Sequence, residues 1–231
     1  MQTAELKVIA GAGIGVPLRE LAARYEKTSG GKLTIFFGTT PELIRKITSG
    51  EAFDVGVAPR EVFEDAGALA RFVPGPRIEI ARVGLAVAVR SGAPKPDIST
   101  PDALKQTLLQ ARSIATIPAS AAGAQILKMF ERFGISEAMK GKIKAQAGPE
   151  QVGQAMLHGE AELGVFLVNV LTVPGLDIVG PFPAEVQREV IYGAAVAEAA
   201  KEPDTARAFI AFLRTPDAKA LIKVKGLQPA A

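Results

Sequence analysis

An α/β fold, with mostly parallel sheets flanked by helices, is what the sequence of 231 residues predicts. Short apolar strands alternate with segments of helical periodicity along almost the whole chain. Several of these strands are continuous apolar runs after their first residue, such as 54–58 and 162–167, which is typical of parallel strands covered on both faces. Three helices share a start of Thr, Pro and an acid, so we predict helix caps at Thr40, Thr100 and Thr215.

The predicted elements follow one another in a regular order. The first part of the chain contains strand 6–10, helix 16–27, strand 33–37, helix 41–48, strand 54–58, helix 60–70 and strand 78–90. A connector rich in Pro and Gly follows at 91–98. The second part contains helix 101–111, strand 113–117, helix 121–133, strand 143–146, helix 149–158, strands 162–167, 176–179 and 188–197, and helices 203–214 and 216–224.

The composition excludes many kinds of site. The chain has no Cys, no Trp and a single His, His158, so thiol chemistry, a thiolate zinc site and a multi-histidine metal site are excluded. We therefore expect no metal, no cofactor and no catalytic residues. The net charge of +3 is spread along the chain, which argues against a nucleic-acid partner. No run of about 18 apolar residues is present that would span a membrane.

The first candidate site is the glycine-rich segment 11–15, between a strand and a helix. Glycines let backbone N–H groups approach a ligand, and the positive end of the helix favours an anion. A dinucleotide site would need a third Gly where Val16 stands and an acid after the second strand. A tight turn without a ligand is the remaining alternative.

Three further strand-to-helix turns resemble this one: 38–41, 118–123 and 148–152. In the first of them we expect Thr40 to cap the helix and Thr39 to remain free for a ligand. Ser120 is a weaker candidate in the second, and ordinary turns remain an alternative in each case. Because ligands of doubly wound folds bind beyond the carboxyl ends of strands, two such turns in each half of the chain suggest two lobes that face each other.

The order of these segments resembles that of the periplasmic molybdate-binding proteins and their wider group, the type 2 solute-binding proteins of ABC importers. The resemblance covers essentially the full length and is carried by the segments 10–14, 37–47, 54–58, 85–89, 118–123, 130–134, 162–165, 174–183 and 208–213. Each segment is weakly specific alone, and their order and spacing together are fairly specific. The chain looks like a divergent branch of the group.

The resemblance implies a two-lobed type 2 fold joined by two crossover strands. Lobe 1 would contain residues 1–82 and 193–231, lobe 2 residues 83–192, and the ligand cleft would lie between them. The oxyanion contacts of the family fall on Gly13, Thr40, Ala122 and Val152, with Leu167 in the place of a Tyr. The resemblance also implies an export leader that the segment from Met1 to Glu5 does not show.

Two of these positions depart from the family pattern. Gly13 stands where the family has a Ser, and Leu167 where it has a Tyr, so two hydroxyl donors are missing. Each loss should cost on the order of 1–3 kcal/mol if nothing replaces the donor. We therefore expect a different ligand, such as a small organic carboxylate. Arg82 could supply a bidentate contact to it, Asn169 is a weaker option, and a surface Arg is the alternative for Arg82.

We expect a monomeric periplasmic receptor that captures a small anion by hinge closure and delivers it to an ABC permease in the inner membrane. The ligand would be an oxyanion of the molybdate or tungstate type or a small organic carboxylate. A cytosolic effector-binding regulatory domain of the same fold is the alternative. An enzyme is disfavoured, because the chain has so few acid–base and nucleophilic groups that fit a catalytic site.

Overall fold

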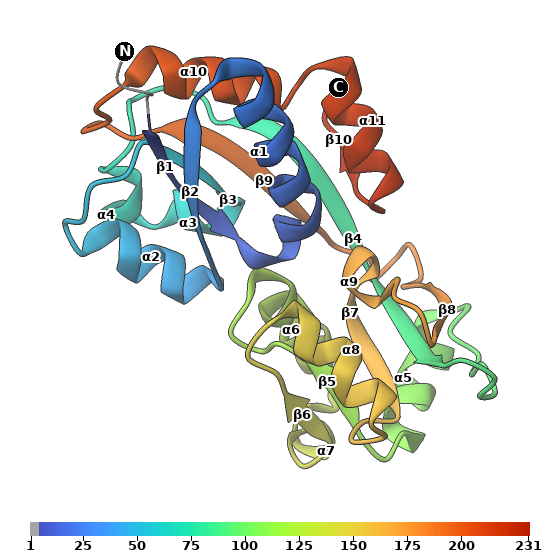
Figure 1. The fold of residues 1–231 in the computed structure, drawn as a ribbon. Helices are drawn as coiled ribbons and strands as arrows, with labels where there is room; N and C mark the ends of the chain where they lie inside the picture. Colours follow the sequence, from blue (N-terminus) through green and yellow to red (C-terminus); the bar gives the residue numbers. More distant parts are fainter. Residues whose placement is uncertain (1–4) are drawn as a thin grey trace. The chain divides into compact units, whose positions relative to one another are not determined.

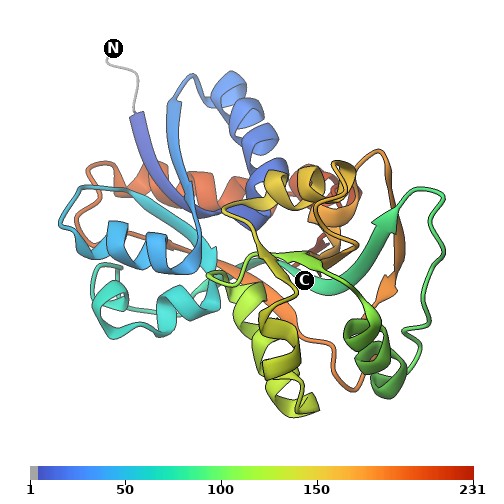
Figure 2. The same cartoon turned by 90° about the horizontal axis from the view of Figure 1, so that it is seen from below.

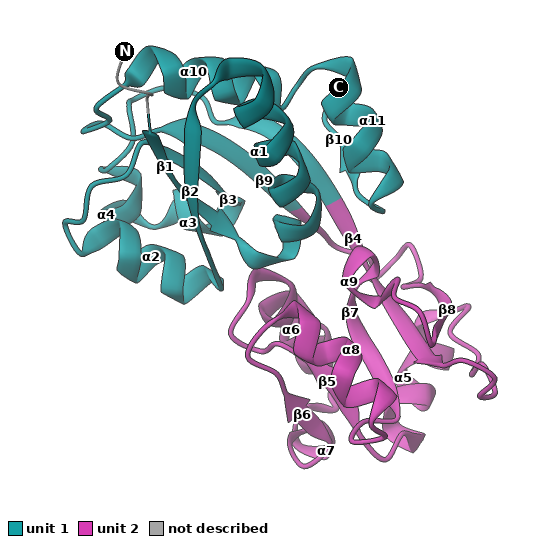
Figure 3. Ribbon diagram, viewed as in Figure 1, with its two compact units in different colours: residues 1–82, 191–231 teal, residues 83–190 magenta. Residues whose placement is uncertain are grey.

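The computed structural model describes residues 5–231 and shows a mixed α/β architecture (Figure 1). The chain forms two compact units (Figure 3). Unit 1 contains the described residues up to Arg82 together with Ile191–Ala231, and unit 2 contains Val83–Val190. The chain crosses between the units within strands β4 (Ile78–Arg90) and β9 (Glu189–Val196), so the two crossover strands are confirmed. Residues 1–4, which bear on the expected leader, lie outside the described residues.

Unit 1 is built on three parallel strands and one antiparallel strand. Its sheet has the order β2-β1-β3-β9; Val8 at the centre pairs with Ile35 of β2 and with Val55 of β3. Besides its parts of β4 and β9, the unit contains β1 (Glu5–Gly11), the 3-10 helix η1 (Ala12–Ile14), α1 (Gly15–Ser29), β2 (Lys32–Gly38), α2 (Thr40–Thr48), β3 (Val55–Pro59), α3 (Arg60–Glu64), α4 (Ala66–Leu69), α10 (Pro203–Phe212), α11 (Pro216–Val224) and β10 (Gln228–Pro229).

The helices of unit 1 cover both faces of its sheet. In Figure 2, α1 and α2 lie on opposite sides of β1 and β2. This follows from the topology, because β1-α1-β2 and β2-α2-β3 cross in opposite directions and each crossover is right-handed. On the α1 side, the ring of Tyr25 lies 5.1 Å from that of Phe209 in α10. On the other side, α2, α3 and α4 pack around Phe53 and Phe72, whose ring centroids are 5.4 Å apart.

A buried carboxylate ties the first strands of unit 1 to the segment after β9. Asp54 is only 4% exposed, and its two side-chain oxygens accept hydrogen bonds from the backbone N–H groups of Lys7, at 2.8 Å, and of Lys201, at 2.9 Å. Buried charge is tolerated only when it is paired or hydrogen-bonded in this way. Asp54 therefore fixes where β3 begins.

Unit 2 repeats the plan of three parallel strands and one antiparallel strand. Its strand order is β4-β7-β5-β6, in which β7, β5 and β6 are parallel and β4 is antiparallel. Strand β8 pairs with β4 as well. The remaining elements are α5 (Pro101–Gln110), β5 (Ile114–Thr116), α6 (Ala121–Phe133), α7 (Ser136–Lys140), β6 (Ile143–Ala145), α8 (Pro149–Leu157), β7 (Leu163–Leu167), α9 (Val168–Leu171) and β8 (Leu176–Pro181). The predicted fold class is confirmed.

The structure corrects several predicted elements. The helix expected at 60–70 is two short helices, because Asp65 leaves the helical conformation and accepts a hydrogen bond from Ala68 N at 2.8 Å. The elements η1, α7, α9 and β10 were not predicted; all are short. Thr100 and Thr215 cap their helices as predicted, whereas Thr40 does not. Within residues 5–231, none of the helices combines the length and the apolar character that a membrane span requires.

Candidate functional site

The first predicted turn begins α1 without any neutralising group. Neither a capping side chain nor an acid is present in the first turn of α1. Gly11 is required for space, because a Cβ there would lie 2.9 Å from Tyr192 Cε1 and 3.0 Å from Pro59 Cδ. Gly13 lies in η1, and its lack of a side chain removes the hydroxyl donor expected of the family. Among the first residues of α1, Pro17 has no N–H and the N–H of Gly15 donates to Ala12 O, while no acidic side chain in the first turn opposes the helix dipole.

The roles of the two threonines at the second turn are the reverse of those predicted. Thr39 is the residue before α2, and both its N–H and its hydroxyl donate to Glu42 Oε2, at 2.7 and 2.8 Å. Thr40 is the first helical residue, and its Oγ1 is buried without a hydrogen-bond partner in the described part of the chain. Since a buried hydroxyl costs free energy unless it is bonded, Thr40 rather than Thr39 keeps an unused polar group.

The third turn is closed by its own side chain. Ser120 caps α6: its Oγ donates to Ile117 O at 2.7 Å and accepts from Gly123 N at 3.0 Å. The hydroxyl proposed as a ligand contact is thus already used inside the turn. Ala122 is 2% exposed, and no acid stands in the first turn of α6.

The fourth turn and the end of β7 are apolar. Val152, inside α8, is fully buried, and Leu167, the last residue of β7, is 2% exposed. Glu150 in the first turn of α8 already opposes the helix dipole. Neither Val152 nor Leu167 offers a side-chain donor.

Arg82 is held by a carboxylate of its own strand. Its Nε and Nη2 donate to Glu79 Oε1, at 3.0 and 2.6 Å. An arginine engaged in this way has less of its fork left for a ligand. The expectation that Arg82 replaces the missing hydroxyls therefore loses its main support.

Two groups of unit 1 at the carboxyl end of its third parallel strand were not predicted from the sequence. Glu61 follows β3 in α3, and its Oε2 is buried with no hydrogen-bond partner among residues 5–231. Burial, and secondarily the charge of Glu61, raises the pKa of the Tyr192 phenol, which packs against Gly11. The rule that ligands bind beyond the carboxyl ends of parallel strands would have pointed to Pro59–Glu61.

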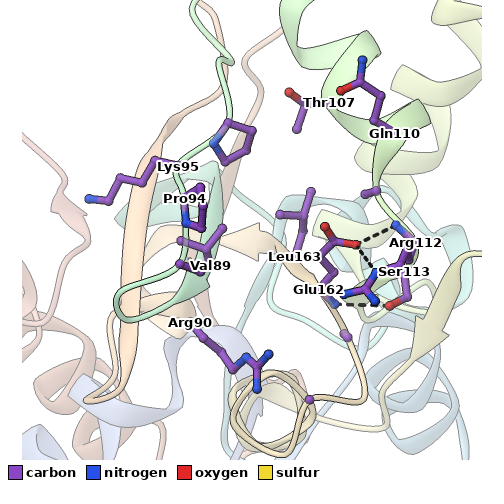
Figure 4. A pocket seen from close by; sticks show the side chains of 15 residues that line it. Val89, Arg90, Pro94, Lys95, Thr107, Gln110, Arg112, Ser113, Glu162 and Leu163 are labelled. Atoms are coloured by element: carbon purple, nitrogen blue, oxygen red, sulfur yellow. Dashed lines mark hydrogen bonds and ion pairs between the residues drawn. The ribbon is translucent and has the colours of Figure 1, made fainter.

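A pocket of about 580 Å³ in unit 2 lies away from the predicted turns (Figure 4). It borders the starts of β5 and β7, whereas the turns follow strand ends. Arg90 and Lys95 lie on one side of it and Arg112 on the other, where Glu162 Oε2 accepts from Arg112 N at 2.8 Å. That hydrogen bond is the main reason why the pKa of Glu162 is lowered. In the part of the chain that the structure describes, no three His, Cys, Asp or Glu residues cluster to hold a metal.

A family model matches almost the whole chain. Residues 6–228 match the model of the bacterial extracellular solute-binding proteins. The chain belongs to this family. Aconitate isomerase of Pseudomonas sp. is 35% identical over 97% of this chain and 87% of its own length. The molybdate-binding protein ModA of Azotobacter vinelandii is 27% identical over 97% of this chain and 90% of its own.

Solved structures share the fold of this chain. The periplasmic molybdate-binding protein of A. vinelandii superimposes with a TM-score of 0.74 at 22% identity, covering 98% of this chain and 100% of that chain. The resemblance to the molybdate-binding group is confirmed. The family, which is described as extracellular, and the relatives support a solute-binding protein for a small anion. One relative carries the name of an enzyme, and the neighbours are mostly binding proteins.

Proposed function

We propose that the chain is the periplasmic solute receptor of an ABC importer and that its ligand is a small organic carboxylate. The observation that carries this is the pair of helix starts, α1 in unit 1 and α6 in unit 2, that have no acid in the first turn. Such starts favour an anion. Each unit by itself therefore offers a helix start that suits an anion.

The choice of a carboxylate over a tetrahedral oxyanion rests on two further points. Gly13 and Leu167 lack the two hydroxyls that the resemblance assigns to oxyanion binding. The relative named aconitate isomerase is also more similar, at 35% identity, than the molybdate-binding relative at 27%. Among the described residues of the four turns, Thr40 has a buried hydroxyl without a hydrogen-bond partner, and a ligand could use it.

The test is a binding panel measured by thermal shift and isothermal titration. The panel contains cis-aconitate, trans-aconitate, citrate, molybdate, tungstate and sulfate. A true ligand at 100 times its Kd should stabilise the fold by about 2.7 kcal/mol. We expect this from at least one carboxylate and a weaker effect from molybdate. Stabilisation by none of these anions would refute an anion receptor, and preference for molybdate would refute the carboxylate.

The Thr40→Val variant locates the site within unit 1. Since Thr40 Oγ1 has no partner among the described residues, the variant should keep its stability and lose affinity by roughly threefold to tenfold. The matched control is Thr48→Val at the other end of α2, where the hydroxyl donates to Ile44 O and should not affect binding. Equal losses in both variants would contradict this placement.

Delivery to a permease requires a cellular experiment. We expect the full-length gene product in the periplasmic fraction, and loss of uptake of the bound carboxylate when the gene is deleted. Fractionation with the cytoplasm would favour the regulatory alternative instead.

A second candidate function is isomerisation of an unsaturated polycarboxylate on the same site, favoured by the 35% identical relative. Moving a double bond by one carbon needs a group that takes a proton from one carbon and returns one to another. Glu61, with its buried unpartnered oxygen, is the candidate base, and Tyr192 lies close enough to feel its charge. Incubation of the protein with trans-aconitate, followed by proton NMR, would show conversion. Glu61→Gln should then abolish turnover and keep ligand binding. If the wild-type protein does not convert trans-aconitate, only the receptor function remains.

A further inference from the structure

We infer that Arg19 binds a carboxylate group of the ligand and takes over the role of the missing hydroxyl donors. This inference rests on the proposed function, because it assumes a small organic carboxylate as the ligand. It assigns the positive charge of the site to a residue that neither the motifs nor the family positions indicate.

The position of Arg19 directs its side chain to the first turn. Arg19 lies four residues after Gly15, on the same face of α1, and helix side chains lean toward the N-terminus of their helix. A Cβ built on Gly15 would lie 3.2 Å from Arg19 Nη1 and 3.5 Å from Phe37 Cε1. The guanidinium is therefore beside the acid-free start of α1.

Phe37 holds the guanidinium between two of the predicted turns. The Cζ of Arg19 lies 4.3 Å from the centroid of the Phe37 ring. Phe37 is the last residue before Gly38, and the paired strands place Gly38 opposite Gly11. Arg19 thus lies at the edge of unit 1 where the turns 11–15 and 38–40 meet. Because all these residues belong to unit 1, the arrangement is independent of unit 2.

The charge of Arg19 has no partner in the described chain. Within residues 5–231, no hydrogen bond or ion pair is formed by Arg19, and its side chain is exposed. Other arginines are engaged differently: Arg24 pairs with Glu20 on the same helix, and Arg207 with Asp204. An unpaired guanidinium beside an unneutralised helix start is a local excess of positive charge.

The chemistry of the guanidinium selects the ligand class. Its planar fork offers two parallel N–H donors, which match the two oxygens of a carboxylate. Stacking on Phe37 holds the plane of the fork in advance, so less side-chain entropy is lost on binding. A surface arginine that only covers an aromatic ring would show the same stacking, and binding measurements separate the two cases.

The experiment compares four proteins by isothermal titration with trans-aconitate, cis-aconitate and citrate: wild type, Arg19→Met, Arg19→Lys and Arg24→Met. We expect Arg19→Met to lose affinity for the carboxylate that binds the wild type by about 10- to 100-fold, the range for hydrogen bonds to a charged group. Arg19→Lys keeps the charge without the fork and should lose at least about threefold. Arg24→Met, one turn further along α1, should stay within about twofold, since a surface ion pair contributes little.

The outcomes distinguish this inference from the proposed function. A wild-type protein that binds no carboxylate overturns both. If the wild-type protein binds a carboxylate, and Arg19→Met and Arg19→Lys bind it as well as the wild type does, the role of Arg19 is overturned and the proposed function stands. Far-UV circular dichroism checks that each variant is folded, and if Arg19→Met does not fold, Arg19→Lys alone decides.

Discussion

Gly123 allows a quantitative test of how the turn before α6 is built. A Cβ added at this position would lie 2.0 Å from Ile117 O and 2.7 Å from Pro118 Cα. Both are backbone atoms, so no side chain can rotate away and the start of α6 itself has to move. Overpacking of this kind costs about 1–3 kcal/mol, which we expect Gly123→Ala to lose even after the small gain of placing Ala in a helix.

Gly153 supplies a matched control in the same unit. It is also buried in a helix, α8, and a Cβ there would meet only Val173 Cγ2, at 3.4 Å, which is an ordinary contact. Gly153→Ala should therefore be neutral or gain about 0.5–1 kcal/mol. The two variants should differ by about 1–4 kcal/mol in their free energies of unfolding.

Urea unfolding followed by far-UV circular dichroism measures this difference. Tyrosine fluorescence serves as a second probe: the chain has no Trp, and its two Tyr residues, Tyr25 and Tyr192, both belong to unit 1. Gly123→Ala should lower the dichroism midpoint whether or not the fluorescence midpoint follows. Equal midpoints for both variants, with unchanged m-values, would refute the steric reasoning.

Three further predictions concern stability and pH. Asp54→Ala should lower the free energy of unfolding by about 2–4 kcal/mol, because the backbone N–H groups of Lys7 and Lys201 lose their acceptor. Urea titration measures this loss, and a loss smaller than that of a surface variant would contradict the prediction. Thr40→Val should keep or raise the thermal midpoint of the unliganded protein, since the Thr40 hydroxyl has no hydrogen-bond partner within residues 5–231. A clear drop in the midpoint would mean that this hydroxyl is hydrogen-bonded after all. Hydrogen bonds from Thr39 lower the pKa of the Glu42 carboxyl from 4.5. The stability that ionised Glu42 adds to the fold is therefore present above that value and is lost as the pH falls through the folded-state pKa. Glu42→Gln should therefore be less stable than wild type at pH 7, and the difference should shrink as the pH falls through the folded-state pKa. A pH-independent difference would contradict this.

The regular elements follow from the sequence because their burial is periodic. Strand β4 and helix α6 have the predicted bounds, since continuous burial in the first and an inward-facing stripe in the second leave few alternatives. The errors occur where a polar side chain competes with the helix. Asp65 breaks the predicted helix at 60–70, and short polar side chains do this by bonding nearby backbone groups.

The candidate site was less predictable than the fold, because it depends on where side chains point. The spacing of Thr39 and Glu42 fits a capping box and was the signal that Thr39, not Thr40, is the cap. Ser120 likewise could be read as a cap or as a ligand contact, and only its two hydrogen bonds decide. Arg19 has no sequence signal of its own, because its place beside Phe37 depends on the pairing of β1 with β2.

The donors at the starts of α1 and α6 are peptide groups, and every residue except proline carries the same one. Mutation at Gly13 or Ala122 therefore reshapes the wall around these donors and leaves the donors in place. A lineage can exchange one ligand for another by changing neighbouring side chains, while the part that recognises negative charge is inherited intact. If these helix starts bind the proposed anion, a change of ligand would appear at neighbouring side chains such as Arg19, and a search for conserved polar side chains would not find the peptide donors.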